Sequence, residues 1–343
     1  MSDDDPGNNI SWTHFPGYRG ETWNTIRGCT HAGTPGCDHC WAEGMARRFD
    51  RPGMWGDGLT KLRTGGEHKG ERRWSGVVKT MPERLEIPMR WRKPRAIFVN
   101  STADLFHPSV PFEFIAAQFG VFAACPRHIF MVLTKRAARM REFFEWLEKT
   151  GKPTWALADA GTVLGVATRW TKHPPADWRW PLPNVILMTT TEDQQRADDR
   201  IPELLACPAA VHGLSVEPML GPIVLPPEFL ALGSRAWVVC GGESGPGARP
   251  MHPDWARSLR DQCVEAGAAY HFKQKGAWTS VTSDDPTWTH MLAPDGRTFA
   301  RGEDIPLSVM TNMSAVAFVK RVGKKAAGRM LDGRTWDEFP DLG

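Results

Sequence analysis

The sequence has 343 residues, of which 41% are hydrophobic and 24% are charged, and its 42 basic and 39 acidic residues give a net charge of +3. This composition excludes a disordered chain, and no apolar run reaches the roughly 18 residues of a membrane-spanning helix. Because the acidic start MSDDD is unlike a basic leader segment, we expect a cytoplasmic protein. Its seven cysteines should then stay reduced, which favours metal binding or catalysis over disulfides.

Short apolar runs rich in β-formers alternate along the chain with helical patterns, which predicts an α/β fold with a parallel sheet. The predicted strands are 23–27, 96–100, 129–134, 184–189, 210–216, 236–240 and 269–273. The predicted helices between them include 111–124, 137–149, 193–206 and 253–266. Seven such strands favour a partial or full (β/α) barrel over an open doubly wound sheet.

The barrel defines three parts of the chain: an N-terminal extension at 1–22, a core at 23–291 and a C-terminal extension at 292–343 with no clear strand. Two insertions interrupt the core. The first, at about 51–95, is rich in glycine and basic residues, and the second, at 151–183, is rich in tryptophan and proline. Both are longer than ordinary connections, so we interpret them as insertions or lids.

Polar residues follow six of the predicted strands. In a parallel barrel the carboxyl ends of the strands meet on one face, where active sites lie, so these residues are candidates for one pocket. The alternative is that they are helix N-caps, a position that the same residue types favour. The candidates are Ser101, Asp104, Thr134, Lys135, Glu192, Glu217, Glu243, Ser244, Lys273 and Gln274.

The most specific feature is a C-x7-C-x2-C motif formed by Cys29, Cys37 and Cys40. Three thiolates can hold a four-iron cluster and leave one iron open to a small molecule. A structural zinc site needs four ligands, and either His31 or His39 would complete it, so zinc remains an alternative. The other thiols stand in apolar contexts typical of inert buried cysteines: Cys125, Cys207, Cys240 and Cys263.

Several blocks together resemble a family of phage and prophage proteins that carry a three-cysteine motif and are catalogued by a domain of unknown function. The blocks are 23–43, 98–107, 132–136, 215–222, 241–246 and 272–274. This family is in turn similar to radical SAM enzymes. The resemblance implies a barrel of the radical SAM type, with a [4Fe-4S] cluster on the three cysteines and S-adenosyl-L-methionine (SAM) on the open iron.

A radical SAM-like enzyme would cleave SAM reductively to a 5′-deoxyadenosyl radical that acts on a substrate. The resemblance implies a reductant protein such as flavodoxin or ferredoxin, and a three-cysteine-motif protein as a further partner. For SAM itself the candidate contacts are Ser101, Asp104, Thr134, Lys135, Glu192 and Glu217. Nearer the substrate, the candidate catalytic residues are Glu243, Ser244, Lys273 and Gln274.

The segment 61–95 carries 11 basic and 4 acidic residues, a net charge of +7, with two tryptophans among them. Basic side chains neutralise phosphates and aromatic rings stack on bases, so the substrate is predicted to be a nucleic acid or nucleotide. The candidate contacts are Arg72, Arg73, Arg90 and Arg92. Two alternatives stay open: a solvated basic surface on an enzyme with a small substrate, and a non-catalytic nucleic-acid-binding protein with a structural zinc knuckle.

Overall fold

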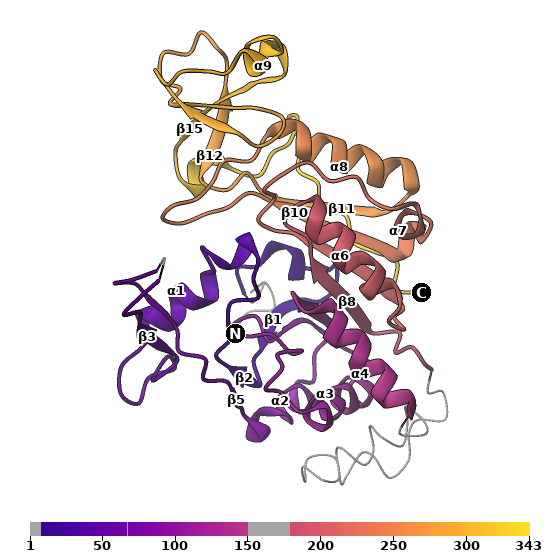
Figure 1. The fold of residues 1–343 in the computed structure, drawn as a ribbon. Coiled ribbons are helices and arrows are strands. Elements are labelled where there is room, and N and C mark those ends of the chain that lie inside the picture. Colours follow the sequence, from indigo (N-terminus) through magenta and orange to yellow (C-terminus); the bar gives the residue numbers. More distant parts are fainter. Residues whose placement is uncertain (1–7, 67, 150–178) are drawn as a thin grey trace. The chain divides into compact units, whose positions relative to one another are not determined.

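The computed structural model describes residues 8–66, 68–149 and 179–343 (Figure 1). The chain divides into two compact units. The first comprises Met1–Thr189, Pro202–His212 and Leu342–Gly343, and the second comprises Thr190–Ile201 and Gly213–Asp341. Each unit holds its own set of the polar residues that the sequence singles out.

Seven strands hydrogen-bond in the order β1-β6-β7-β8-β9-β10-β11. They are β1 (Arg19–Trp23), β6 (Arg95–Val99), β7 (Ile129–Thr134), β8 (Val185–Thr190), β9 (Val211–Val216), β10 (Ala236–Gly241) and β11 (Ala269–Gln274). The strands follow one another in chain order and pair in parallel, as in part of a (β/α) barrel. The predicted α/β class is confirmed, and six of the seven predicted strands match to within one residue at each end.

The first strand of the sheet differs from the prediction. A strand was expected at 23–27, but β1 ends at Trp23. The side-chain oxygen of Asn100 accepts hydrogen bonds from the backbone N–H groups of Thr25 and Ile26, at 2.8 and 3.2 Å. These bonds take the place of a strand ladder, so the chain leaves the sheet at this point.

The helices of the two units connect the strands or flank them. In the first unit they are α1 (Trp41–Arg48), α2 (Ile87–Arg90), α3 (Phe112–Ala124) and α4 (Ala137–Lys149), with 3₁₀ turns η1 (Ser11–Thr13), η2 (Pro35–Cys37) and η3 (Pro82–Arg84). Further along the chain are α6 (Gln194–Leu205), α7 (Pro227–Leu230), α8 (Pro253–Ala266), α9 (Leu307–Met310) and α10 (Lys324–Ala327), with η4 (Gly233–Arg235) and η5 (Met313–Ala315).

An aromatic cluster fixes α3 and α4 in the first unit. The rings of Phe119 and Phe143 lie 5.3 Å apart, and Phe122 lies 4.5 Å from Phe130 of β7. Burial of each such ring stabilises the fold by about 1.5–3 kcal/mol. The carboxyl end of β7, which carries Thr134, therefore stands on a well-packed base.

Helix α8 in the second unit has a defined start and end. The ring of His252 accepts a hydrogen bond from the Asp254 N–H at 3.2 Å, and the helix ends at Gly267 with φ of 68°. Because glycine adopts this left-handed conformation without strain, it ends the helix efficiently. The hydroxyl of Tyr270 on β11 donates to the Ala256 carbonyl oxygen at 3.0 Å and joins the helix to the sheet.

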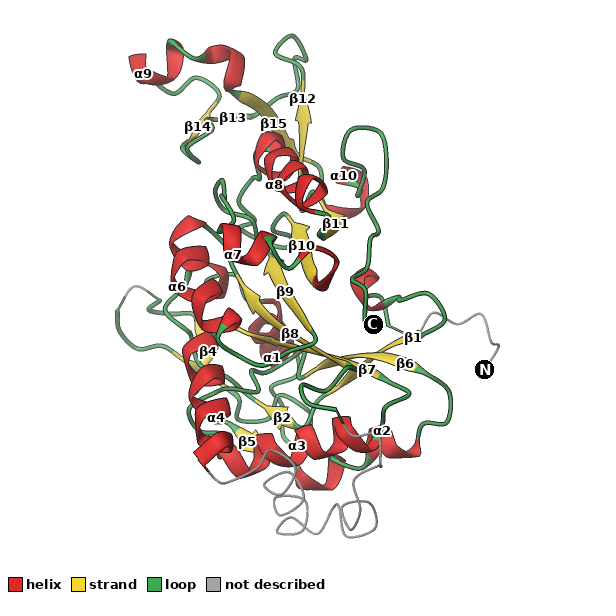
Figure 2. Cartoon of the chain, turned by 90° about the vertical axis from the view of Figure 1, so that its right-hand side faces the viewer, coloured by secondary structure: helices red, strands yellow, loops and turns green. Residues whose placement is uncertain are grey.

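The C-terminal part of the chain corrects a second expectation, because two of its strands lie entirely within the extension at 292–343, where no clear strand was expected. Four strands pair in the antiparallel order β12-β15-β13-β14 (Figure 2). Met291 and Val316 belong to its small core, against which Trp288 and Phe318 pack. Strands of three to five residues give too short an alternation to be recognised in the sequence. The strands are β12 (Trp278–Val281), β13 (His290–Leu292), β14 (Thr298–Ala300) and β15 (Ala317–Arg321).

The predicted insertion at 51–95 folds into short paired strands. β2 (Ile26–Arg27) pairs with β5 (Lys79–Thr80), and β3 (Thr60–Leu62) pairs with β4 (Arg72–Trp74), both antiparallel. The insertion predicted at 151–183 lies outside the described residues up to position 178. In the ranges that the structure describes, no helix combines the length and the apolar character needed to span a membrane.

Candidate functional site

The three cysteines of the motif lie on the segment that follows β2 in the first unit. The segment begins at Gly28, where φ is 82° and a Cβ atom would come within 2.0 Å of the Val77 carbonyl oxygen. Only glycine fits there. The turn η2 and the start of α1 directly after Cys40 complete the loop, so one local fold carries all three thiols.

The three thiols form no disulfide bonds. Cys37 is buried and accepts a hydrogen bond from the Thr34 hydroxyl at 3.7 Å, while Cys29 and Cys40 are partly buried. Burial raises the pKa of Cys29 to about 12, and it also raises the pKa of Cys40. The negative charge of a neighbouring thiolate raises these pKa values further: that of Cys40 acts on Cys29, and that of Cys37 acts on Cys40. At neutral pH Cys29 and Cys40 therefore hold their protons, which metal binding would release.

A metal centre on this loop would need the three thiols and, for zinc, a histidine as the fourth ligand. Within residues 8–66, 68–149 and 179–343, no three His, Cys, Asp or Glu side chains are arranged to hold a metal ion, so binding requires the thiols to converge. His31 is already engaged: its Nε2 lies 2.9 Å from Asp38 Oδ1, and its Nδ1 accepts from the Gly33 N–H at 3.0 Å. A closed zinc site using His31 would break these bonds, whereas a cluster with one open iron needs only the three thiolates.

Asp104, one of the predicted SAM contacts, is bound to its own neighbours. Asp104 is 6% exposed. The carboxylate accepts hydrogen bonds from the Thr134 hydroxyl at 2.7 Å and from the Arg136 guanidinium at 2.7 Å. It also accepts from the backbone N–H groups of Phe106 at 2.9 Å and Lys135 at 3.2 Å. The structure thus brings Asp104, Thr134 and Lys135 together, with the Asp104 carboxylate at the centre of the network.

Arg136 connects this network to the cysteine loop. Besides its ion pair with Asp104, its guanidinium donates to the Thr30 carbonyl oxygen at 3.0 Å and to the Thr30 hydroxyl oxygen at 3.2 Å. The same guanidinium lies 3.9 Å from the sulfur of Cys29. Charged donors near a thiolate stabilise its negative form. Arg136 therefore both positions the loop and supplies positive charge at one predicted ligand.

His107 supports the same loop in its neutral form. Burial lowers the pKa of His107 to about 4, with Arg136 as the next cause. Its Nδ1 accepts a hydrogen bond from the Ser109 N–H at 3.1 Å, so Nε2 carries the proton and donates to the Thr30 hydroxyl at 2.9 Å. Thr30 is thus held from two sides.

Sequence reasoning missed Arg136, Thr30 and His107 as members of the site. Each stands beside a residue or block that the sequence did single out, since Thr30 follows Cys29 and Arg136 follows Lys135. Ser101 has a different partner: its hydroxyl donates to the Asn24 side-chain oxygen at 3.3 Å.

The predicted nucleic-acid contacts differ in their surroundings. Arg73 is 7% exposed, and its guanidinium binds Glu43 of α1 and the Asp38 carbonyl oxygen, both at 2.8 Å. It joins the β3–β4 hairpin to the cysteine loop. Arg72 pairs with Asp50. The remaining two, Arg90 and Arg92, are exposed.

In the second unit, Glu217 and Lys273 lie beyond β9 and near the end of β11. The Lys273 ammonium is 2.9 Å from the Glu217 carboxylate. Lys324 is close enough for its pKa to be lowered, first by burial and then by the charge of Lys273. At Gly241 a Cβ atom would come within 2.8 Å of the Glu217 carboxylate. An alanine there would make the Glu217 carboxylate shift from this position.

The other predicted residues of the second unit are held in separate contacts. Glu192 is fully buried and pairs with Arg200 at 2.9 Å. Glu243 binds the Arg249 guanidinium at 2.7 Å, and Gln274 donates to the Gly242 carbonyl oxygen at 3.0 Å. Ser244 is exposed.

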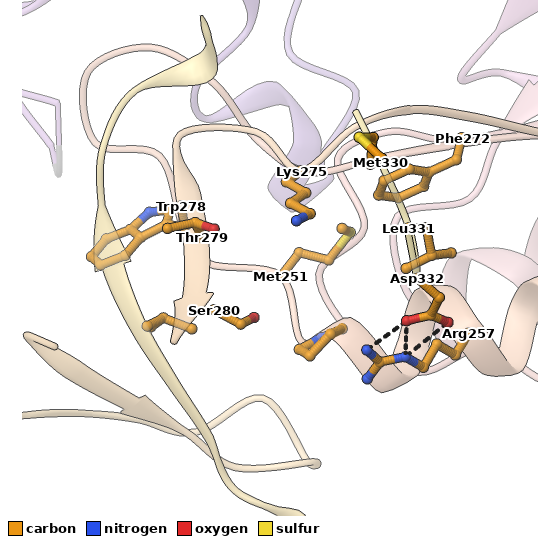
Figure 3. A pocket seen from close by; sticks show the side chains of 12 residues that line it. Met251, Arg257, Phe272, Lys275, Trp278, Thr279, Ser280, Met330, Leu331 and Asp332 are labelled. Carbon is orange, nitrogen blue, oxygen red and sulfur yellow. Dashed lines mark hydrogen bonds and ion pairs between the residues drawn. The ribbon is translucent and has the colours of Figure 1, made fainter. Parts of the chain in front are cut away.

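A small cavity of about 80 Å³ also lies in the second unit (Figure 3). Figure 3 shows the Arg257 guanidinium facing the Asp332 carboxylate at its edge, with bonds of 2.7–3.2 Å. Lys275, Trp278 and the apolar side chain of Met251 lie around it. This volume is well below the roughly 300–1,000 Å³ of ordinary ligand pockets, so it is too small for SAM.

A family model described as a protein of unknown function (DUF5131) matches residues 7–340. No curated protein and no solved structure matches the chain.

Proposed function

Because the chain belongs to the DUF5131 family of proteins of unknown function, we propose its activity from its own residues: an iron–sulfur enzyme of the radical SAM type. The observation that carries the proposal lies within the first unit. A loop with three thiols and no disulfide is bound by Arg136, the second residue beyond the carboxyl end of β7. In (β/α) barrels that end of the strands is the catalytic face.

The proposal assigns Cys29, Cys37 and Cys40 as the ligands of a [4Fe-4S] cluster. When bound, the cluster and SAM supply the one-electron cleavage of the sulfonium that yields methionine and a 5′-deoxyadenosyl radical. No fourth protein ligand is required, which agrees with the engagement of His31 by Asp38 and Gly33.

The chain's own residues prepare the loop for this role. Arg136 hydrogen-bonds Thr30 and lies 3.9 Å from the Cys29 sulfur, so it favours the thiolate over the thiol when a metal is bound. Asp104 holds Arg136 in this position. Hydrogen bonds to ligand sulfurs raise the reduction potential of such clusters, so Arg136 is proposed as a positioning residue that also sets the potential.

Lys135 supports the second ligand in a similar way. Its positive charge acts against burial on the pKa of Cys40. The strand-end residues predicted as direct SAM contacts therefore act first on the cysteine loop: Asp104 and Thr134 through Arg136, and Lys135 through its charge.

The proposal is tested with anaerobically reconstituted protein reduced by dithionite in the presence of SAM. Chromatography should detect 5′-deoxyadenosine and methionine, even without substrate. Cys40→Ala should abolish both products, and Cys263→Ala, at a buried thiol elsewhere in the chain, should not. A loaded and reducible cluster that neither binds nor cleaves SAM would contradict the proposal.

A further inference from the structure

A cavity of about 470 Å³ lies against the cysteine loop, on the side of the β3–β4 hairpin. The loop contributes Thr30, His31 and Asp38 to its wall. The hairpin and the turns beside it contribute Lys61, Arg63, His68, Arg73, Trp74 and the glycines at 65, 66 and 76. Its volume is that of a pocket for a nucleotide-sized ligand.

The basic residues of this cavity share one face of the hairpin. Lys61 and Arg63 are two positions apart and therefore project to the same side, and Arg73 is the cross-strand partner of Lys61. Like charges placed opposite each other destabilise a hairpin. The charge of Arg73 is compensated by Glu43 at 2.8 Å, but no described residue forms an ion pair with Lys61 or Arg63.

The acidic residues of the wall already bind other residues of the protein. The carboxylate of Glu43 binds Arg73 and the Trp74 N–H, at 2.8 and 2.6 Å. Asp38 binds His31 at 2.9 Å. Among the described side chains of the wall, two positive charges therefore have no compensating partner: those of Lys61 and Arg63.

The glycines of the wall bring bare backbone to the cavity. A Cβ atom at Gly65, Gly66 or Gly76 would meet nothing within 4 Å. Gly66 has φ of 77°, and the N–H groups of Gly65 and Gly66 donate to no acceptor in the described part of the chain. Successive backbone N–H groups in such a turn form a concavity that binds anions.

We propose that this cavity binds a phosphate-bearing ligand of nucleotide size, with Lys61, Arg63 and the Gly65–Gly66 backbone as its phosphate contacts. The chemistry is shared by a free nucleotide and by one nucleotide of a single strand. Only the interpretation of this ligand as the enzyme's substrate rests on the proposed function. The binding itself needs no cluster.

Binding is measured on the full-length chain with two probes. ADP is titrated by calorimetry, and a fluorescein-labelled oligothymidylate is titrated by fluorescence anisotropy across a salt series. The charge variant Lys61→Gln/Arg63→Gln should weaken binding of at least one probe by about tenfold or more. For the oligothymidylate it should also reduce the salt slope by about 1.4, two charges at roughly 0.7 each.

Two further variants separate the cavity from the general basic surface. Gly65→Leu adds a side chain into the open space without strain, because Gly65 is not in the left-handed region, and it should block binding without changing charge. Arg47→Gln/Arg51→Gln removes two exposed charges outside the cavity and should change affinity by less than about threefold.

Each outcome has one meaning for the cavity. Loss of binding in both the charge variant and Gly65→Leu supports the phosphate-binding cavity. The probe that binds then shows whether the ligand is a free nucleotide or part of a single strand. No binding of either probe at low salt overturns it, and so does an equal loss in Arg47→Gln/Arg51→Gln. Iron content and SAM cleavage are measured in the same preparation, so the iron–sulfur proposal and the phosphate cavity can fail independently.

Discussion

The buried ion pair between Asp104 and Arg136 should contribute measurably to the stability of the metal-free protein. Asp104 is 6% exposed and the Arg136 side chain 13% exposed, and their charged atoms are 2.7 Å apart. Removing one partner of a buried pair leaves an uncompensated charge and costs about 3–5 kcal/mol. We therefore expect Asp104→Asn to lower the free energy of unfolding of the metal-free protein by about that amount.

A double-mutant cycle identifies the cause. Arg136→Met removes the charge that Asp104→Asn leaves unpaired, so the double variant should be more stable than the sum of the single losses by about 1–3 kcal/mol. Urea unfolding followed by circular dichroism measures all four proteins. Glu86→Gln and Arg90→Met serve as the control cycle, since this pair is exposed on one short helical turn and should couple by no more than about 0.5 kcal/mol. A coupling between Asp104 and Arg136 as small as that of the control would refute the role given to this pair.

Three other results are expected. Replacing any one of Cys29, Cys37 and Cys40 by alanine should abolish iron binding, measured as iron per chain. The alanine variants of Cys125, Cys207 and Cys263 should keep their iron. Burial raises the pKa of Cys125 to about 11. The contribution of its thiol to the free energy of unfolding is therefore complete below about pH 8.5 and declines toward pH 11, because the thiol ionises first in the unfolded chain. Urea unfolding at several pH values should show a smaller loss of stability with rising pH in Cys125→Ala than in the wild-type chain. Gly242→Ala should destabilise by about 1–3 kcal/mol because its Cβ would lie 2.2 Å from the Lys275 backbone carbonyl oxygen. Gly44→Ala, within α1 and with its nearest contact at 3.8 Å, should be neutral or stabilising in the same urea assay.

Most of the sheet could be predicted from the sequence because several of its strands, such as β7, β8 and β10, are mainly apolar. β7 consists of the residues IFMVLT between polar neighbours, and its bounds match the prediction. The exception at β1 arises from Asn100, which is 75 positions from Thr25 in the chain. A side chain that ends a strand from such a distance leaves no local pattern.

Of the residues that meet at the candidate site, the sequence singles out the cysteines by their local spacing and Asp104, Thr134 and Lys135 by their places near predicted strand ends, but not Arg136. The contact of Arg136 with Thr30 joins positions 106 apart, so no spacing reveals it. The neighbours Arg72 and Arg73 show the same limit. Alternation on a strand predicts that they face opposite sides, but which side is buried depends on where Glu43 lies.

The metal content of anaerobically purified protein distinguishes an iron–sulfur cluster from a zinc site. Iron, acid-labile sulfide and zinc are measured on the wild-type chain and on the variant with Cys29, Cys37 and Cys40 all replaced by alanine. The account predicts a brown protein with about four iron and four sulfide per chain, and neither in the variant. A colourless wild-type protein with one zinc per chain would contradict it.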